Sequence, residues 1–442
     1  MLWIELGILL LCIVVGARRG GIALGTVSGL GLVFFMVVLG LPPGSPPAVV
    51  LGMILAVITA LSMMEAAGGM NYLVATAEGL LRRNPRRITF LAPFVSYLLI
   101  FAAGTQHVIY SLLPVIAEVS TRAGVRPERP LSMSVIAAQH GLVASPVSAV
   151  TVALLAALTP LGVSLGQILM VTLPATLIGV AAGILSVAWK GRELSQEPGF
   201  ENAVAQSGRG GEEKDTASPD TGTRGRGPCL TFLIAVVVVV LFGLFPELRP
   251  TYSTLVDGVT TDTPVDMGRV IMIVMLAAAG VITLLFKADP ALAVKGKLMQ
   301  GGLVAIISIL GVSWLGSSFF TANEATIVGA ISSLVASYPW VFALGLFVLS
   351  ILLFSQAATV VILLPVGVAM GMPPHLLLGV YPAVNGNFFL PTYGTVLAAV
   401  SFDQTGTTHI GRYLLNHSFM LPGLVTTFCA TLAALVLAWL LL

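Results

Sequence analysis

Long apolar runs, repeated from one end of the chain to the other, most constrain how this sequence can fold. A helix crosses the bilayer core with about 20 consecutive apolar residues, and runs of that kind recur throughout the 442 residues. Hydrophobic residues make up 57% of the chain and charged residues only 9%, whereas soluble domains contain roughly 25% charged residues. The sequence therefore predicts an all-α polytopic membrane protein with about 10–12 transmembrane segments.

Charge and cysteine content exclude several other classes. The net charge of +2 gives no reason to expect a nucleic-acid partner. Cys12, Cys229 and Cys429 each stand alone in an apolar run, which indicates packing rather than a disulfide framework or a metal site. No cofactor is expected. Arg18 and Arg19 follow the first apolar run and no basic residue precedes it, which is the opposite of a secretory signal peptide.

A polar segment divides the chain into two apolar halves. Residues 191–227 are rich in Gly, Ser, Pro and charge and contain little to bury. This composition predicts a disordered linker, with 1–190 as the first half and 228–442 as the second.

Loop charges predict how the two halves are oriented. Each loop of the first half differs in basic character from its counterpart in the second. The basic loops 17–21, 82–87 and 121–130 correspond to 246–269, 321–339 and 371–375, whereas the uncharged loop 41–47 corresponds to the basic segment 286–299. Because basic loops stay in the cytoplasm, the halves are expected to be inverted-topology repeats, with a cytoplasmic linker and both termini outside. Two tandem bundles with unrelated loop charges are the alternative.

Matching interruptions in the two halves predict a substrate site. The runs GTQHVIYSLLPVIAEV (104–119) and SQAATVVILLPVGVAM (355–370) both open with polar residues and contain Leu-Leu-Pro-Val. A second pair follows, ASPVSAVTV (144–152) and NGNFFLPTYGTVLAAV (385–400). Proline frees a backbone carbonyl, and polar groups at membrane depth are tolerated where protein encloses a cavity. Discontinuous or re-entrant helices that start at these points would direct their N-termini at a bound solute.

Candidate site residues come from these four segments. The expected substrate-binding residues are Gly104, Thr105, Gln106, His107, Ser145, Ser148, Ser355, Gln356, Thr359, Asn385, Asn387, Thr392 and Thr395. His140, Asp403 and Arg412 are candidates for coupling or gating. The alternatives are helix–helix packing for the small and hydroxyl residues, and an ion pair or a helix cap for Asp403 and Arg412. No catalytic or metal-binding residue is expected.

Several motifs make the chain resemble the anaerobic C4-dicarboxylate transporters of the Dcu family. They include GARRGGIALG (16–25), LLRRNPRRIT (80–89), LLPVIAEV (112–119), RPERPLS (126–132), ASPVSAV (144–150), GVSWLG (311–316), SQAAT (355–359), PAVNGNFFLPTY (382–393) and TGTTHIGRYLLNHSFMLPG (405–423). The resemblance covers nearly the whole chain except the linker, and is nearest to the fumarate–succinate branch. It implies a bacterial inner-membrane exchanger, not an enzyme, that takes up fumarate, malate or aspartate and releases succinate. The resemblance leaves open whether the chain forms a homo-oligomer and whether it binds a sensor kinase.

Four positions depart from the family pattern. A basic residue is expected where this chain has Val361, an aspartate where it has Ser317, a glycine where it has Gln106 and another aspartate where it has Asn71. If the family's basic residue and aspartate at these first two positions form an ion pair, both charges would be lost together, because an unpaired buried charge is far more costly than an absent pair. If the basic residue instead bound a substrate carboxylate, transport of a different organic anion is the nearest alternative. Ion coupling stays open.

Overall fold

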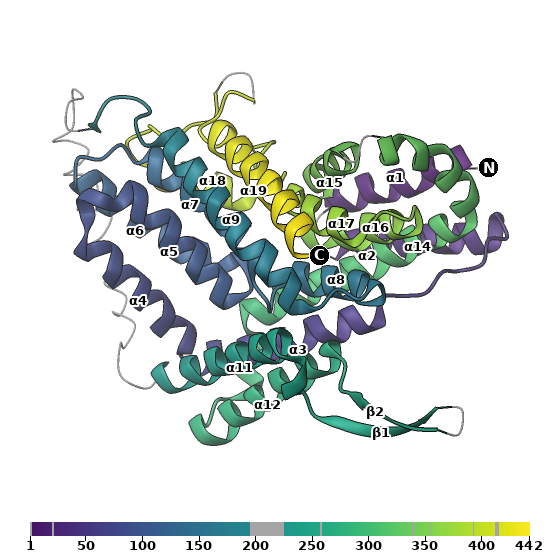
Figure 1. The fold of residues 1–442 in the computed structure, drawn as a ribbon. Helices are drawn as coiled ribbons and strands as arrows, with labels where there is room; N and C mark the ends of the chain where they lie inside the picture. The colour runs from purple at the N-terminus through teal and green to yellow at the C-terminus, as the bar shows by residue number, and fades with distance from the viewer. Residues whose placement is uncertain are drawn as a thin grey trace.

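The computed structural model describes residues 2–19, 22–194, 225–256, 259–337, 340–353, 355–391, 393–411 and 415–442. The first half forms α1 (Leu2–Arg19), α2 (Ala23–Val33), α3 (Ala48–Ala66), α4 (Gly69–Arg83), α5 (Ile88–Ala103), α6 (Ile109–Arg122), α7 (Glu128–Ala144), α8 (Ala149–Leu158) and α9 (Leu165–Val187). The second half forms α11 (Arg226–Leu244), α12 (Met267–Phe286), α13 (Pro290–Lys295), α14 (Lys297–Ser337), α15 (Trp340–Leu353), α16 (Gln356–Ala369), α17 (Pro374–Val380), α18 (Gly394–Phe402) and α19 (Met420–Leu441) (Figure 1).

The helices confirm the predicted fold class. Among the described residues, eight helical segments are long and apolar enough to cross a membrane, and α15, α16 and three others are shorter apolar helices. The chain is therefore an all-α polytopic membrane protein. The expected linker, 191–227, lies mostly outside the described residues. Its described ends are Gly191 to Leu194, which follow α9, and the first residues of α11.

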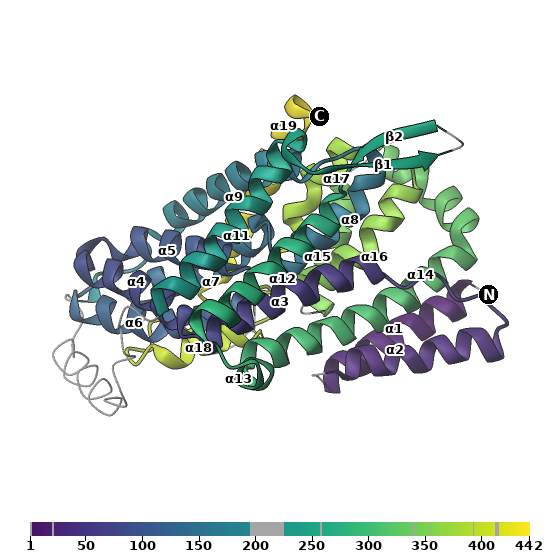
Figure 2. The ribbon, with the colours of Figure 1, turned by 90° about the horizontal axis from the view of Figure 1, so that it is seen from below.

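Two connections differ from the simple loops that the sequence suggested. Within 246–269, β1 (Thr251–Val256) and β2 (Val259–Pro264) form an antiparallel hairpin that projects beyond the helices in both views (Figures 1 and 2). Residues 321–337 continue α14 as helix. In the first half the corresponding path is broken between α3 and α4 at Gly68, whose φ of +79° favours glycine. In the second half, α14 instead continues as helix through Gly316 and on to Ser337.

Helices in matching positions pack reciprocally. The order of elements pairs α2 with α12, α3 with α14, α6 with α16, α8 with α18 and α9 with α19. α12 packs on α3 and α14 packs on α2, as Figure 2 shows, while α8 packs on α16 and α18 on α6. Each helix thus packs on the counterpart of the helix that its own equivalent contacts, which is the pattern expected when a pseudo-two-fold axis relates the two halves.

The equivalent helices α9 and α19 run antiparallel where they pack together. A Cβ atom built on Gly179 would lie 2.7 Å from the Ala430 Cβ, and one built on Gly183 would lie 2.0 Å from the Thr426 Oγ1. The contact thus advances along α9 while it retreats along α19. Small residues allow this close approach, as is common between membrane helices. Antiparallel equivalent helices are the arrangement that inverted repeats require.

The α5–α6 segment turns back on itself. α5 packs against α6, and the Arg82 Nη2 before α5 lies 3.0 Å from the Glu118 Oε2 near the end of α6. Both ends of the segment therefore lie on the same side, and its tip is the polar turn that begins at Gly104. This is the geometry of a re-entrant helical hairpin.

Candidate substrate site

Four helices begin at the interruptions that the sequence marked. α5 ends at Gly104, where φ is +65°, and a 3₁₀ turn over 106–108 leads into α6. The Ser148 Oγ caps α8 by accepting the Thr151 N–H at 3.2 Å. The Ser355 Oγ caps α16 in the same way, accepting the Ala358 N–H at 3.2 Å. Hydroxyl caps of this kind satisfy backbone donors that a helix start leaves free.

The starts of α6, α8, α16 and α18 line one cavity of about 520 Å³, within the usual range for small-molecule sites. The residues that these segments contribute are Gly104, Thr105, Gln106, Tyr110, Val147, Ala149, Val150, Ser355, Gln356, Ala357, Asn387, Tyr393, Gly394 and Thr395. Each helix N-terminus carries partial positive charge from its unpaired N–H groups. We call this face of the cavity the polar wall.

A second part of the cavity lining is apolar except for Ser308. It consists of residues from α2, α3 and α14, with Gly16 of α1, and includes Leu24, Ile54, Leu298 and Gly302. We call this face the smooth wall. None of the described residues that line the cavity is charged. The electrostatic field in the cavity therefore comes from backbone and side-chain dipoles.

Polar side chains join the two halves at the polar wall. The Tyr393 hydroxyl donates to the Gln106 Oε1 at 3.0 Å, which leaves the Gln106 Nε2 without a partner although Gln106 is only 7% exposed. The Asn387 Oδ1 and the Thr395 Oγ1 are also buried without a partner among the described residues. Buried polar atoms are normally hydrogen-bonded, so these groups are suited to a polar solute.

The structure separates the predicted binding residues into two groups. Gly104, Thr105, Gln106, Ser355, Gln356, Asn387 and Thr395 line the cavity, whereas Ser145, Ser148, Thr359 and Asn385 do not. Thr392 and the side chain of His107 lie outside the described part of the structure.

The second group is bonded to the backbone around the helix breaks. The Ser145 Oγ donates to the Phe101 carbonyl at 2.7 Å, and the Thr359 Oγ1 donates to the Ser355 carbonyl at 2.8 Å. The Asn385 Nδ2 donates to the Pro382 carbonyl at 3.0 Å, while its Oδ1 accepts from the Gln356 Nε2. These side chains hold the breaks in place.

Comparison with known proteins identifies the family. Residues 1–442 match the DcuA/DcuB family, described as anaerobic C4-dicarboxylate membrane transporters. The chain belongs to the DcuA/DcuB family. It is 39% identical over 437 residues to the anaerobic C4-dicarboxylate transporter DcuB of Escherichia coli O157:H7, covering 96% of this chain and 95% of that protein. It is 38% identical to the C4-dicarboxylate transporter DcuA of Wolinella succinogenes over 430 residues, covering 96% of each chain.

Two tyrosines of this DcuA/DcuB member were missed by reasoning from the sequence. Tyr393 and Tyr110 both line the cavity, and a Cβ atom on Gly394 would lie 2.4 Å from the Tyr110 hydroxyl. Tyr393 stands in the stretch 385–400 that drew attention for its amides and threonines. The sequence did contain a signal for Tyr393, which lies beside the proline break in this stretch. A buried tyrosine hydroxyl usually has a hydrogen-bond partner, so a contact from this residue could have been expected.

The three gating candidates lie apart from the cavity or outside the described residues. His140 is fully buried within α7, where its Nδ1 is 3.0 Å from the Ile136 carbonyl. Asp403 accepts hydrogen bonds from Thr405, Thr407 and the Thr408 N–H. Arg412 is not among the described residues.

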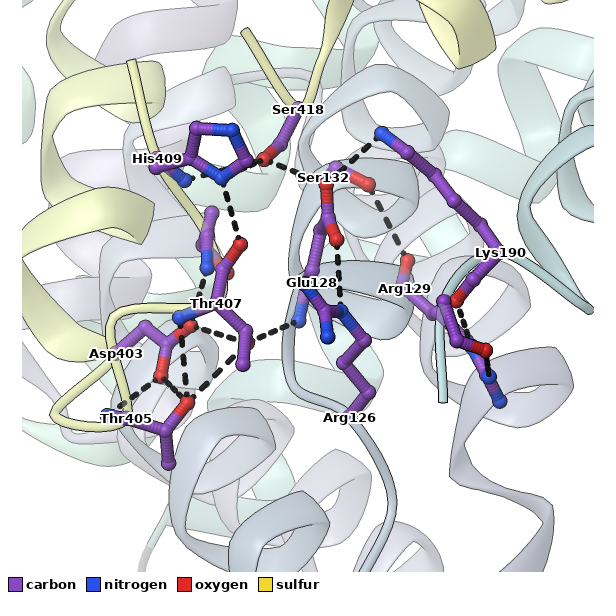
Figure 3. A network of polar contacts seen from close by, with 12 residues as sticks. Arg126, Glu128, Arg129, Ser132, Lys190, Asp403, Thr405, Thr407, His409 and Ser418 are labelled. Atoms are coloured by element: carbon purple, nitrogen blue, oxygen red, sulfur yellow. Dashed lines mark hydrogen bonds and ion pairs between the residues drawn. The ribbon is translucent and has the colours of Figure 1, made fainter. Parts of the chain in front are cut away.

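Asp403 belongs to a polar network that centres on Glu128, at the start of α7 (Figure 3). Glu128 is 2% exposed and accepts from the Arg126 Nε at 2.9 Å, the Lys190 Nζ at 2.8 Å and the Ser418 Oγ at 2.8 Å. The Thr407 hydroxyl connects the Glu128 N–H to the Asp403 Oδ2. The network fastens the segment before α19 to the ends of α7 and α9.

Proposed function

We propose that this chain exchanges C4-dicarboxylates across the bacterial inner membrane by alternating access, with fumarate, malate or aspartate entering and succinate leaving. The observation that carries the proposal is the convergence of four helix N-termini on one cavity without charged lining residues among those described. The DcuB and DcuA relatives are named as C4-dicarboxylate transporters, which supports the same substrate class. Homo-oligomerisation and a partner sensor kinase stay predictions.

The charge at the polar wall suits a dianion. A helix N-terminus is equivalent to roughly half a positive charge, so four of them supply about two. Unpaired N–H groups at these ends also bind carboxylate oxygens directly. A substrate with two carboxylates would be balanced by such a site, whereas a cation would be repelled.

The same electrostatics favour exchange over net uptake. Because no described lining residue carries a compensating charge, a dianion crosses the membrane with its charge. Moving two negative charges inward against 100 mV, inside negative, costs about 4.6 kcal/mol at about 2.3 kcal/mol per charge. Returning a second dianion in the opposite direction cancels this cost. Exchange of fumarate for succinate is therefore expected to be insensitive to the membrane potential.

The two walls indicate how access alternates. The four breaks belong to α5–α8 and α15–α18, whereas the smooth wall belongs to α1–α3 and α14. An apolar face with small residues makes few directional contacts, so the unit carrying the polar wall can shift against it. Gly16 and Leu298 of the smooth wall adjoin the basic segments at Arg18–Arg19 and Lys295–Lys297. By the positive-inside rule, the cavity lies toward the cytoplasm, and both termini lie in the periplasm.

Transport of another organic anion is the second candidate. The family pattern places a glycine at Gln106 and a basic residue at Val361, and Gln106 lines the cavity. The added amide changes the hydrogen-bonding groups that the substrate meets. On this scaffold, an anion with a different arrangement of acceptors would then be preferred.

Uptake into proteoliposomes tests both candidates. Labelled fumarate is offered to vesicles that are loaded with succinate or left empty, with and without a potassium diffusion potential set by valinomycin. We expect rapid uptake only into succinate-loaded vesicles, at a rate that the potential does not change. Equal uptake into empty vesicles would contradict exchange. If folded protein takes up no fumarate under any of these conditions, the dicarboxylate assignment is wrong and the second candidate replaces it.

A further inference from the structure

We propose that each half of the chain binds one carboxylate of the substrate: the starts of α6 and α8 hold one, and the starts of α16 and α18 hold the other. This assignment rests on the proposed function. It states which half of the chain binds which end of a dicarboxylate. Two carboxylates are then recognised because the chain contains two similar halves.

Within each half, the two breaks form a single unit. In the first half, a Cβ atom on Gly104 would lie 2.8 Å from the Val147 Cγ2, and the Ser145 Oγ reaches the Phe101 carbonyl at the end of α5. The starts of α6 and α8 are thereby fixed relative to each other. Residues at both helix starts line the same cavity.

The second half repeats this unit with different side chains. The Gln356 Nε2 donates to the Asn385 Oδ1, and the Gly386 N–H donates to the Ser350 Oγ at 2.9 Å. These bonds join the break before α16 to the break before α18. The cavity is thus lined by two preassembled pairs of helix N-termini, one from each half.

Each pair adds at least one buried donor that has no partner. In the first half this is the Gln106 Nε2, oriented because the Gln106 Oε1 accepts from Tyr393. In the second half it is the Thr395 hydroxyl, in the first turn of α18 and 2% exposed. Both residues line the cavity. An unpaired buried donor is costly, and a carboxylate oxygen would satisfy each one.

The contacts between the halves place the two pairs on either side of a seam. Tyr393 reaches across it to Gln106, and Gly394 lies against Tyr110. A linear dianion that bridges this seam would contact both halves at once. A monocarboxylate of similar size would contact only one half.

The assignment is tested by binding of succinate and of its monomethyl ester to the purified full-length protein in lipid nanodiscs, measured by calorimetry. The variants are Gln106→Leu, Thr395→Val and the two combined. Thr172→Val is the matched control, because its hydroxyl is equally buried and unpartnered but lies in α9, away from the cavity. Gln106→Met is a second variant if the leucine impairs folding.

We expect each single variant to weaken succinate binding by about tenfold, the effect of losing one hydrogen bond to a charged group. Binding of the monoester should change by less than about twofold in each single variant, because the ester can use the intact half, and should fall in the double variant. Thr172→Val should change neither. If one single variant weakens both ligands while the other changes neither, both carboxylates lie in one half and the assignment is overturned. If wild-type protein binds no dicarboxylate at all, the proposed function itself fails.

Discussion

At the scale of single residues, the same polar residue types have two roles at the helix breaks. One group donates hydrogen bonds to nearby backbone carbonyls, namely Ser145, Thr359 and Asn385. The other group has a buried polar atom without a partner at the cavity, namely Gln106 and Thr395. Composition indicates that both kinds belong to a break in the membrane. Which kind a residue is depends on whether an unpaired carbonyl lies within reach, and only the packed structure decides that.

Replacing Glu128 by glutamine should destabilise the protein strongly. The change removes a buried negative charge that pairs with Arg126 and Lys190, and a neutral amide oxygen is a weaker acceptor for both cations. Breaking a buried ion pair typically costs about 3–5 kcal/mol. We expect a clear fall in the thermal unfolding temperature in detergent, measured by intrinsic fluorescence.

Glu193→Gln is the matched control for this prediction. Glu193 is 43% exposed and pairs with Arg129 at 2.7 Å, and Arg129 also donates to the Lys190 and Gly191 carbonyls. Exposed pairs contribute about 0–1 kcal/mol, so this variant should unfold near the wild-type temperature. Equal shifts in the two variants would show that burial of Glu128 contributes nothing.

At the scale of elements, close backbone approach determines which helices pair. α2 crosses α14 at Gly25, where a Cβ atom would lie 2.1 Å from the Ile307 carbonyl oxygen, and at Gly311, where it would lie 2.1 Å from the Gly25 oxygen. Neither glycine is required by backbone conformation, because both lie within regular helices. Their role is to leave space, which composition alone does not reveal.

Gly25→Ala should therefore disrupt the α2–α14 contact, because the added methyl group meets backbone that cannot rotate away. Gly29→Ala, also on α2, meets no atom within 4 Å and should be neutral or slightly stabilising, since alanine favours helix by about 1 kcal/mol over glycine. Yield and monodispersity in size-exclusion chromatography distinguish the two variants. Similar behaviour of both would refute the role of Gly25 in packing.

Ser317 and Val361, two of the departures from the family pattern, lie on α14 and α16, two helices that pack together. A Cβ atom built on Gly316 of α14 would lie 3.9 Å from Ile362 of α16, so each departure is next in sequence to a residue at the contact between these helices. The Ser317 Oγ is 3.0 Å from the Trp314 carbonyl and requires no charged partner. This arrangement supports the hypothesis that the family's two charges form a pair.

Val361→Lys alone should then lower expression or exchange, because it places one unpaired charge in the membrane. Adding Ser317→Asp should restore much of the loss. Exchange of labelled fumarate, normalised to the amount of protein, measures both. If the lysine alone is harmless, or the double variant is no better than the single, the pairing hypothesis is wrong.

At the scale of the whole molecule, the predicted inversion of the halves would account for several features together. α9 and α19 occupy equivalent positions yet run antiparallel. The segment before α19 bonds to Glu128, where α7 begins, and Glu128 in turn pairs with Lys190, just after α9. In parallel repeats that segment would lie at the other end of α9. Inversion also lets hairpins from opposite sides meet at one cavity, as alternating access requires.

Labelling of single cysteines tests the inversion. Thr159 follows α8 and Gln404 follows α18, which are equivalent helices, and both residues are exposed. In a background with Cys12, Cys229 and Cys429 replaced by alanine, an impermeant maleimide should label Thr159→Cys in intact cells. It should label Gln404→Cys only after permeabilisation. Labelling of both positions from the same side would exclude inverted repeats.

The sequence by itself determined the membrane class, the positions of the four breaks and the family, because hydrophobic length, proline and polar residues act locally and can be recognised in order along the chain. Seven of the thirteen binding candidates line the cavity, because they lie at or beside the helix starts that the polar residues and prolines mark along the chain. The tertiary structure alone decided which polar atoms stay unpaired, that Tyr110 and Tyr393 join the halves, and that Glu128 holds a distant segment. Those outcomes depend on distances between residues far apart in the chain, which packing sets and local pattern does not encode.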